Sequence, residues 1–124
     1  MEAFTHIEKK IIALGESHVY INSYNDDYDN IAAIHYYGDI VPDVSFGNET
    51  IARYIDFQVF VRDNDFETGY SRIEAIRLMF SAYSYQCITI TPKGDINMLG
   101  NDEKNRANLT LNFSMKLIDG NTVT

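Results

Sequence analysis

Two long stretches in which apolar and polar residues alternate constrain the fold more than any other feature of the sequence. From 107 to 117, apolar residues stand at every odd position and Asn, Thr, Ser or Lys at every even one. From 51 to 62, Ile51, Ile55, Phe57, Val59 and Val61 share one face. Since successive side chains of a strand point to opposite faces, both stretches indicate strands with one buried and one solvated face. Such strands are typical of an antiparallel sheet covered on one side.

Two other segments have the period of an amphipathic helix. Residues 2–14 carry apolar side chains three and four positions apart, and Gly15 follows as a helix-ending residue. Residues 65–83 also carry apolar side chains three and four positions apart. The first stripe consists of Phe4, Ile7, Ile11 and Leu14, and the second of Phe66, Tyr70, Ile73, Ile76, Phe80 and Tyr83. Two such helices can cover one face of the sheet.

Shorter segments complete the predicted organisation. Residues 18–24, 31–37 and 86–91 have strand character, and 96–99 would pair back after the turn-like "TPKGD". Residues 38–50, with two Gly and one Pro, are interpreted as a long excursion. The sequence therefore predicts a single α+β domain over residues 1–124, a mainly antiparallel sheet with two helices packed on one face, in the order α-β-β-β-α-β-β-β. Its predicted core contains Phe57, Val59, Ile73, Ile76, Phe80, Leu111 and Phe113.

Composition excludes several classes of function. The formal net charge of −8 disfavours a surface for nucleic acid or anionic membrane, both of which need clustered Lys and Arg. Cys87 is the only cysteine, so we expect no intrachain disulfide, and its apolar neighbours "ITI" indicate a buried side chain. We expect neither a signal peptide nor a membrane span, and hence synthesis in the cytoplasm.

The acidic segment between strand 51–62 and the second helix allows two interpretations. Asp63, Asp65, Glu67 and Glu74 have some of the spacing of a calcium loop, but Thr68 stands where such a loop needs Gly. A helix N-terminus explains the same residues, with Asp63 or Asp65 as the N-cap and further acids favoured by the helix dipole. We therefore interpret the segment as a joint between strand and helix.

No other pattern predicts a catalytic or cofactor site. The acidic run 25–30 also lacks the central Gly of a calcium loop, which favours a turn. The histidines His6, His18 and His35 lie on separate elements, and only convergence in space could make them metal ligands. We find neither a phosphate-binding glycine pattern nor a nucleophile elbow. The sequence thus predicts a protein that is not an enzyme, with no catalytic residue, cofactor or metal.

Several apolar residues stand in segments predicted as loops. They either fold back on the core or mark a protein interface. These candidate interface residues are Val41, Val44, Phe46, Ile96, Met98 and Leu99.

Residues 51–83, "IARYIDFQVFVRDNDFETGYSRIEAIRLMFSAY", resemble the tail terminator proteins of long-tailed bacteriophages. That family is also described as tail completion or minor capsid proteins. The resemblance lies in a strand with aromatic residues that ends near "VR", a short polar joint, and a helix with spaced aromatic residues. The length, the acidity, the leading helix and the closing "NLTLNFSMKL" strand agree with it over most of the chain.

The resemblance implies a structural role in virion assembly. Such a protein forms a homo-hexameric ring on the major tail tube protein, stops tube polymerisation and offers the surface for head–tail joining to the connector or neck protein. Its location is the tail of the virion, at the head–tail junction, after synthesis in the host cytoplasm. No specific nucleic-acid binding and no membrane contact are implied, although genomic DNA passes through the bore.

Six copies would carry a formal charge of 6 × −8 = −48. A wall that does not bind phosphate suits the passage of DNA, so acidic side chains should predominate on the inner rim. The candidates are Asp39, Asp43, Glu49, Asp95, Asp102 and Glu103.

Two alternatives remain open at this point. One is another phage neck or connector component of similar fold. The other is a small α+β enzyme or ligand-binding domain with a pocket lined by His35, Tyr36 and Tyr54.

Overall fold

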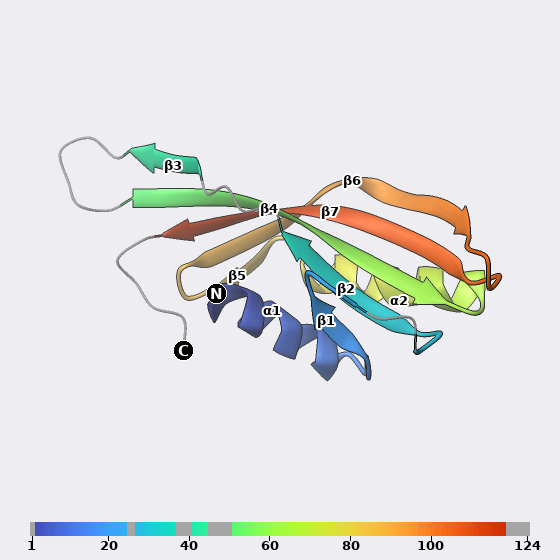
Figure 1. The fold of residues 1–124 in the computed structure, drawn as a ribbon. Helices are drawn as coiled ribbons and strands as arrows, with labels where there is room; N and C mark the ends of the chain where they lie inside the picture. Colours follow the sequence, from blue (N-terminus) through green and yellow to red (C-terminus); the bar gives the residue numbers. More distant parts are fainter. Residues whose placement is uncertain (1, 25–26, 37–40, 45–50, 119–124) are drawn as a thin grey trace.

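The computed structural model of the protein describes residues 2–24, 27–36, 41–44 and 51–118. These residues form two helices and a seven-stranded sheet (Figure 1). The elements are α1 (Glu2–Ala13), β1 (Val19–Ile21), β2 (Ile31–Tyr36), β3 (Val41–Val44), β4 (Ile51–Asp63), α2 (Phe66–Met79), β5 (Tyr83–Tyr85), β6 (Ile88–Asn101) and β7 (Ala107–Ile118). The predicted α+β class and the predicted order are confirmed, with β3 as an additional strand.

The two long alternating stretches are neighbours at the centre of the sheet. The strand order is β1-β2-β4-β7-β6-β5, and β3 pairs with the first part of β4. β4 and β7 run antiparallel in unbroken register from Ala52 opposite Ile118 to Asp63 opposite Ala107. Only the short pair β1–β2 is parallel among the described pairs, so the sheet is mainly antiparallel, as predicted.

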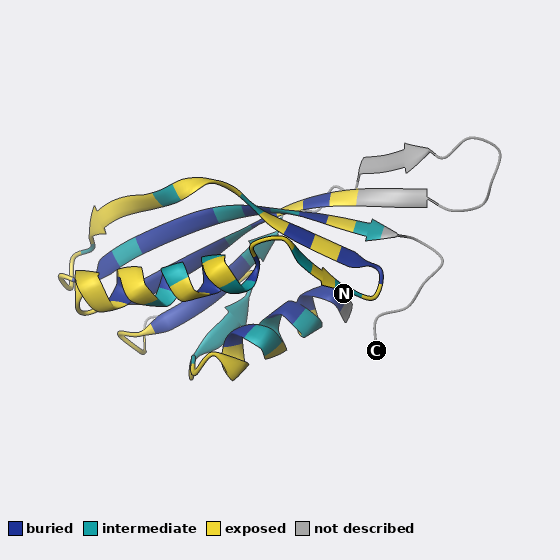
Figure 2. Ribbon diagram, turned by 180° about the vertical axis from the view of Figure 1, so that it is seen from behind, coloured by how far each residue is buried: buried dark blue, intermediate teal, exposed yellow. Residues whose placement is uncertain are grey.

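Both helices cover the same face of the sheet (Figure 2). The odd-numbered residues from Ile55 to Val61 in β4 and from Ala107 to Met115 in β7 face them and form one apolar core with the inner stripes of α1 and α2. The rings of Phe57 and Phe113 stack with centroids 5.1 Å apart, and Phe80 meets Phe113 edge-on at 5.8 Å. All seven predicted core residues are fully buried. Cys87 is also buried, as expected.

The ends of the helices follow their local sequence. Asp65 is the N-cap of α2, since its carboxylate accepts a hydrogen bond from the Thr68 amide at 3.0 Å. Gly15 follows α1 with φ +108, a backbone conformation that suits glycine. The predicted strand-to-helix joint is therefore confirmed. Neither helix has the length and apolar character needed to cross a membrane, within the described ranges.

Three segments differ from their predicted structure. The second helix, predicted over 65–83, runs only from Phe66 to Met79, and Tyr83 begins β5 instead. Residues 41–44, assigned to the excursion, form β3 against β4. The segments 86–91 and 96–99 do not form separate strands joined by a turn at "TPKGD", because β6 continues from Ile88 to Asn101. Gly94, with φ +87, and register shifts between Lys93 and Asn97 absorb the extra residues as a bulge.

The apolar stripe of α2 is buried only in part. Ile73, Ile76 and Phe80 have no exposed surface, whereas Phe66 is 44% and Tyr70 42% exposed. The predicted stripe therefore extends beyond the buried side of α2 at its first two members. Tyr70 lines a groove with residues of β6, and its ring contacts that of Phe66.

Candidate functional site

The predicted interface residues fall on two separate strands. Met98 and Leu99 lie in the second half of β6, 63% and 61% exposed, while Ile96 is half-buried against the main core. Val41 and Val44 belong to β3, whose side chains lie outside the described part of the structure, as does residue Phe46 altogether. Because β7 and β4 separate β6 from β3, the structure does not bring the two groups together within one chain. For Ile96 the interpretation that it folds back on the core holds.

The predicted acidic residues are also spread. Asp95 and Glu103 are exposed, at the β6 bulge and in the loop between β6 and β7. Asp43 lies in β3, whose side chains are not described, and the positions of Asp39 and Glu49 lie outside the described ranges.

Asp102 has a structural role in the β6–β7 loop. One carboxylate oxygen accepts hydrogen bonds from the amides of Lys104 and Arg106, each at 3.0 Å, and the other pairs with the Arg106 guanidinium at 2.9 Å. The amide of Arg106 is the main cause that holds the pKa of Asp102 below its usual range. The charge of Asp102 is therefore used within its own loop, which leaves Asp95 and Glu103 as the exposed acidic candidates among the side chains that the structure describes.

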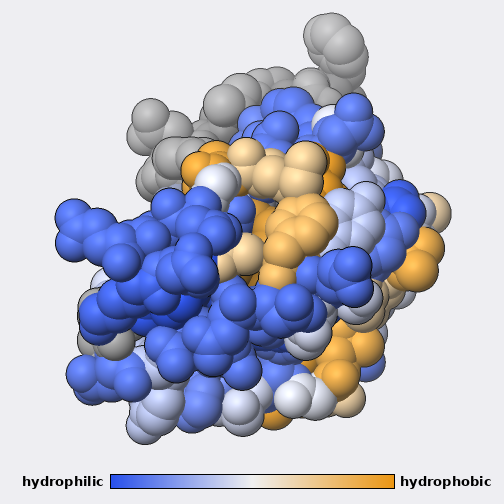
Figure 3. Space-filling model, turned by 90° about the vertical axis from the view of Figure 1, so that its right-hand side faces the viewer, coloured by the Kyte–Doolittle hydropathy of each residue, from blue (hydrophilic) through white to orange (hydrophobic). Residues whose placement is uncertain are grey.

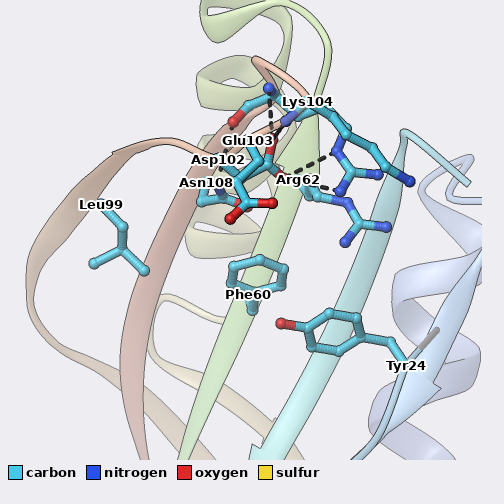
Figure 4. Close-up of a pocket in the computed structure, with 9 residues that line it drawn as sticks. Tyr24, Phe60, Arg62, Leu99, Asp102, Glu103, Lys104 and Asn108 are labelled. Atoms are coloured by element: carbon cyan, nitrogen blue, oxygen red, sulfur yellow. Dashed lines mark hydrogen bonds and ion pairs between the residues drawn. The ribbon is translucent and has the colours of Figure 1, made fainter. Parts of the chain in front are cut away.

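A shallow hollow of about 480 Å³ opens on the face of the sheet away from the helices (Figure 4). The rings of Phe60 and Tyr24 stack there at 5.1 Å, and the Arg62 guanidinium lies 5.5 Å from the centre of the Tyr24 ring. Leu99 borders the hollow from β6, across β7 from Phe60. The lining consists of Tyr24, Phe60, Arg62, Leu99, Asp102, Glu103, Lys104, Arg106 and Asn108.

Both arginines that line this hollow are buried and engaged in internal contacts. Arg62 and Arg106 are only 3% and 4% exposed. Arg62 donates to the carbonyl oxygen of Tyr28, and Arg106 pairs with Asp102 and, at 3.5 Å, with Asp29. The hollow thus offers an aromatic floor with a rim of mixed charge. This arrangement suits contact with a side chain or a planar ligand.

Sequence reasoning missed this aromatic cluster. The alternation in β4 placed Phe60 and Arg62 on the solvated face, yet both are buried. Tyr24 follows β1 in a polar segment, and the path of such a segment is set by tertiary contacts that no local pattern reports. Figure 3 views one end of the molecule and shows apolar surface gathered near its centre, with hydrophilic residues around it.

The four carboxylates first compared with a calcium loop do not converge. Asp63 accepts from Arg72 at 2.9 Å and from the Asp65 amide at 2.9 Å, while Asp65 caps α2. Glu74 pairs with Arg77. No group of three or more His, Cys, Asp or Glu that could hold a metal occurs among the described residues.

Arg72 joins α2 to two other parts of the chain. Its guanidinium pairs with Glu16 and Asp63 and donates to the carbonyl oxygens of Arg62 and Ile31. Burial alone would lower the pKa of Arg72, but the hydrogen bonds and charges of the two carboxylates outweigh it and raise that pKa. This cluster fixes the joint between β4 and α2.

The histidines lie in separate aromatic contacts. His6 bonds the Tyr83 hydroxyl at 2.7 Å and stacks on Tyr85, with ring centroids 4.1 Å apart. His18 stacks on Tyr28 with ring centroids 3.7 Å apart, and His35 makes an edge-on contact with Tyr24 at 5.8 Å. Burial, followed by the charges of two nearby lysines, lowers the pKa of His6.

The pocket suggested for an enzyme is contradicted by the structure. Tyr36 stacks on Phe4 at 4.1 Å, on the helix side of the sheet. Its neighbour His35 lies on the opposite face with Phe60, because adjacent residues of a strand alternate. The Lys116 ammonium lies over the ring of Tyr54, 5.8 Å from its centre. These three predicted residues do not line one cavity.

Comparisons with known proteins assign no family to this chain. No protein-family model matches it. No curated protein sequence matches it either. Functional interpretation therefore starts from the geometry above and from the resemblance of residues 51–83.

Proposed function

We propose that this protein is a structural subunit of a long-tailed bacteriophage, a tail terminator that closes the tail tube as a homo-hexameric ring. The ring would stop polymerisation of the major tail tube protein and form the joining surface to the head connector, within the virion. The segment that carries the resemblance comprises β4, the Asp65-capped joint and α2. In this proposal the protein acts through contacts and has no catalytic residue.

Exposed apolar side chains on β6 carry the proposal. Met98 and Leu99 are adjacent in a strand, so they point to opposite faces of the sheet, and more than half of each is exposed. Burying such side chains against another subunit gains roughly 25 cal/mol for each Å² of apolar surface. A contact between unlike surfaces of successive copies can close into a ring. Leu99 therefore fits a contact with a neighbouring subunit, and Met98, on the opposite face, fits a contact with another protein such as the tube.

Charge supports the same role. Asp95 and Glu103 are exposed near the two ends of the second half of β6. If this part of the subunit faces the bore, their carboxylates repel the phosphates of passing DNA and keep the wall from binding it. The remaining acidic candidates would add to that field where they face the same side.

The mass of the purified protein in solution tests this proposal. Light scattering after size exclusion should give six times 14.2 kDa, about 85 kDa, at high protein concentration or in the presence of tail tubes. Leu99→Asp should remain folded, reduce the hexamer and yield tails of uncontrolled length. Leu78→Asp is the matched control, since Leu78 on α2 is equally exposed at 61%. A monomer under all these conditions, or normal tails from Leu99→Asp, would overturn the proposal.

A ligand-binding domain is the second candidate function, and the aromatic hollow favours it. The stacked Phe60 and Tyr24 rings fit the face of a small planar molecule. A stable monomer that binds such a molecule saturably, with binding abolished by Tyr24→Ala, would support this candidate over the ring.

A further inference from the structure

The edge of the sheet at β6 is open along most of the strand. β6 pairs with β7 on one side, but on the other side it pairs with β5 only from Ile88 to Ile90. From Thr91 to Asn101 its outer side has no partner strand among the described residues. Figure 1 shows this part of β6 as the border of the sheet, and Figure 2 shows it mainly in the colour of exposed residues.

The first part of this edge carries most of the devices that keep strand edges from pairing. Pro92 lacks an amide donor, Lys93 is charged, and a register shift follows. The part beyond, from Asp95 to Asn101, contains neither Pro nor Lys and displays Met98, and a second register shift lies between Met98 and Gly100. This less protected part, with an exposed apolar side chain, is a site where another strand can add.

The exposed flank of α2 lies beside this edge. Tyr70, Glu74 and Arg77 of α2 line an open groove of about 420 Å³ together with Gly94, Asp95 and Ile96 of β6. The two exposed aromatic residues of α2, Phe66 and Tyr70, contact each other with ring centroids 6.0 Å apart.

Contacts of α2 with β7 place Met98 on this same side. A Cβ atom added to Gly69 would lie 3.0 Å from Leu109 of β7, so α2 crosses the sheet close to that residue. Met98 pairs with Leu109 in the register of β6 and β7. Met98 is therefore next to the position where Phe66 and Tyr70 leave the core. The unburied part of the α2 stripe and the unpaired strand edge form one surface.

We propose that this groove binds an extended segment of a different polypeptide, which adds a strand to the outer edge of β6. The open edge offers backbone donors and acceptors in strand geometry, which another polypeptide backbone can satisfy. Alternate side chains of the added strand would point toward α2 and cover Tyr70 and Met98. Those positions of the partner are therefore apolar.

Charge identifies the chemistry of the remaining positions. Glu74 and Arg77 pair with each other, so Asp95 leaves the groove with a formal charge of −1, on a chain of net charge −8. A segment with Lys or Arg between its apolar residues is attracted by this field, whereas an identical edge from a second copy brings the same acidic groove. The occupant is therefore a basic, alternating strand from another protein. This inference needs only one copy of the chain and does not depend on the hexameric ring.

Binding of a synthetic probe tests the proposal. The probe is a short peptide, capped at both ends, in which lysine and valine alternate. In ¹⁵N NMR spectra of the protein, the peptide should shift the amide signals of residues 95–101 and slow their hydrogen exchange. The same peptide with N-methyl groups on the pairing edge loses its strand hydrogen bonds and should bind about tenfold more weakly or worse.

Variants of the protein locate the site. Met98→Ser and Tyr70→Ser should each weaken binding of the peptide by about three- to tenfold. Two variants are used so that a folding defect in one of them does not decide the result. Leu78→Ser, on the same helix but outside the groove lining, should bind like the wild type. Circular dichroism confirms that each variant is folded.

Three outcomes would overturn the inference. The first is equal binding of both peptides, which indicates attraction by charge alone. The second is no change at residues 95–101 with the peptide at high concentration. The third is that concentrating the protein alone slows hydrogen exchange at residues 95–101 and also shifts the signals of Tyr70 on the helix side, which makes a second copy the occupant. A ring contact through Leu99 lies on the opposite face of the sheet and leaves Tyr70 unchanged. Light scattering reports the ring separately, so failure here leaves the proposed function to its own test.

Discussion

Phe80 and Phe66 stand at the two ends of α2 and have opposite environments. Phe80 is fully buried, with Phe113 and Tyr83 edge-on at 5.8 and 5.1 Å, whereas Phe66 is largely open to solvent. Phe80→Ala should lower the free energy of unfolding by roughly 3–5 kcal/mol because it removes core contacts and leaves a cavity. Phe66→Ala is the control and should cost less than about 1 kcal/mol. Urea denaturation measures both; a loss below about 1 kcal/mol for Phe80→Ala would mean that α2 faces the other way.

His6 should give stability a pH dependence of its own. Burial, and then Lys10 and Lys9, lower the pKa of His6 from its ordinary value of 6.5. The unfolded chain then binds this proton more readily, so the contribution of His6 is complete above pH 6.5 and is lost as the pH falls below it. His6→Gln should flatten the fall in unfolding free energy between about pH 7 and 5. Parallel curves for the variant and the wild type would contradict this assignment. The effect is small because His6 is half-exposed.

At the scale of elements, the joint between β4 and α2 predicts different losses of stability for variants of its two neighbouring acidic residues. Asp65 caps the helix at the surface, so Asp65→Ala should lower the free energy of unfolding only slightly. Asp63 is buried and holds the Arg72 guanidinium, so Asp63→Ala leaves a buried charge with one carboxylate fewer and should cost about 3 kcal/mol. Thermal and urea denaturation should show the larger loss for Asp63→Ala. The reverse order would mean that the Arg72 cluster does not fix the joint.

The same joint should be indifferent to metal. Asp63 and Asp65 already accept hydrogen bonds from protein donors, and Glu74 pairs with Arg77. Removing divalent ions with EDTA should therefore leave the melting temperature unchanged, and calcium should not raise it. A fall in melting temperature with EDTA that calcium restores would identify the joint as a cation site after all.

Sequence period predicted the elements whose burial is decided locally. From Ile55 to Val61 in β4 and from Ala107 to Met115 in β7, every second residue enters the core, so the alternation itself carries the fold, and Phe57 and Phe113 were placed correctly. The sequence predicted two short strands where β6 forms one, because Pro92 and Gly94 occur both in turns and in bulges. Only the pairing of β6 with β7 decides between a turn and a bulge. β3 depends on its long-range pairing with β4 in the same way.

The candidate sites also differ in whether a local sequence pattern could predict them. Met98 and Leu99 were recognised because apolar residues outside a clear period need an explanation, and both are exposed. The Tyr24–Phe60 stack and the open side of α2 at Tyr70 were missed. Each depends on which strand ends the sheet and where a polar segment runs, and neither property has a local signature.

At the scale of the whole molecule, charge makes ring formation depend on salt. Six copies with a formal charge of −8 each repel one another, and this repulsion is screened as the Debye length falls from about 30 Å at 0.01 M to about 8 Å at 0.15 M salt. The hexamer should therefore form at lower protein concentration in the higher salt. Light scattering at the two ionic strengths measures this, and a ring that weakens with added salt would indicate attraction between oppositely charged surfaces instead.

The direction in which Asp95 and Glu103 face decides whether the ring can pass DNA without binding it. The double variant Asp95→Lys with Glu103→Lys raises the formal charge of each chain by four. If these residues lie on the inner rim, the variant ring should retain DNA at low salt, while tails keep their normal length. Asp27→Lys with Glu67→Lys makes the same change in charge at two other exposed positions and is the control. Mobility-shift assays compare the rings: equal retention of DNA by both variants would show that only total charge matters, and no retention by the rim variant would place Asp95 and Glu103 outside the bore.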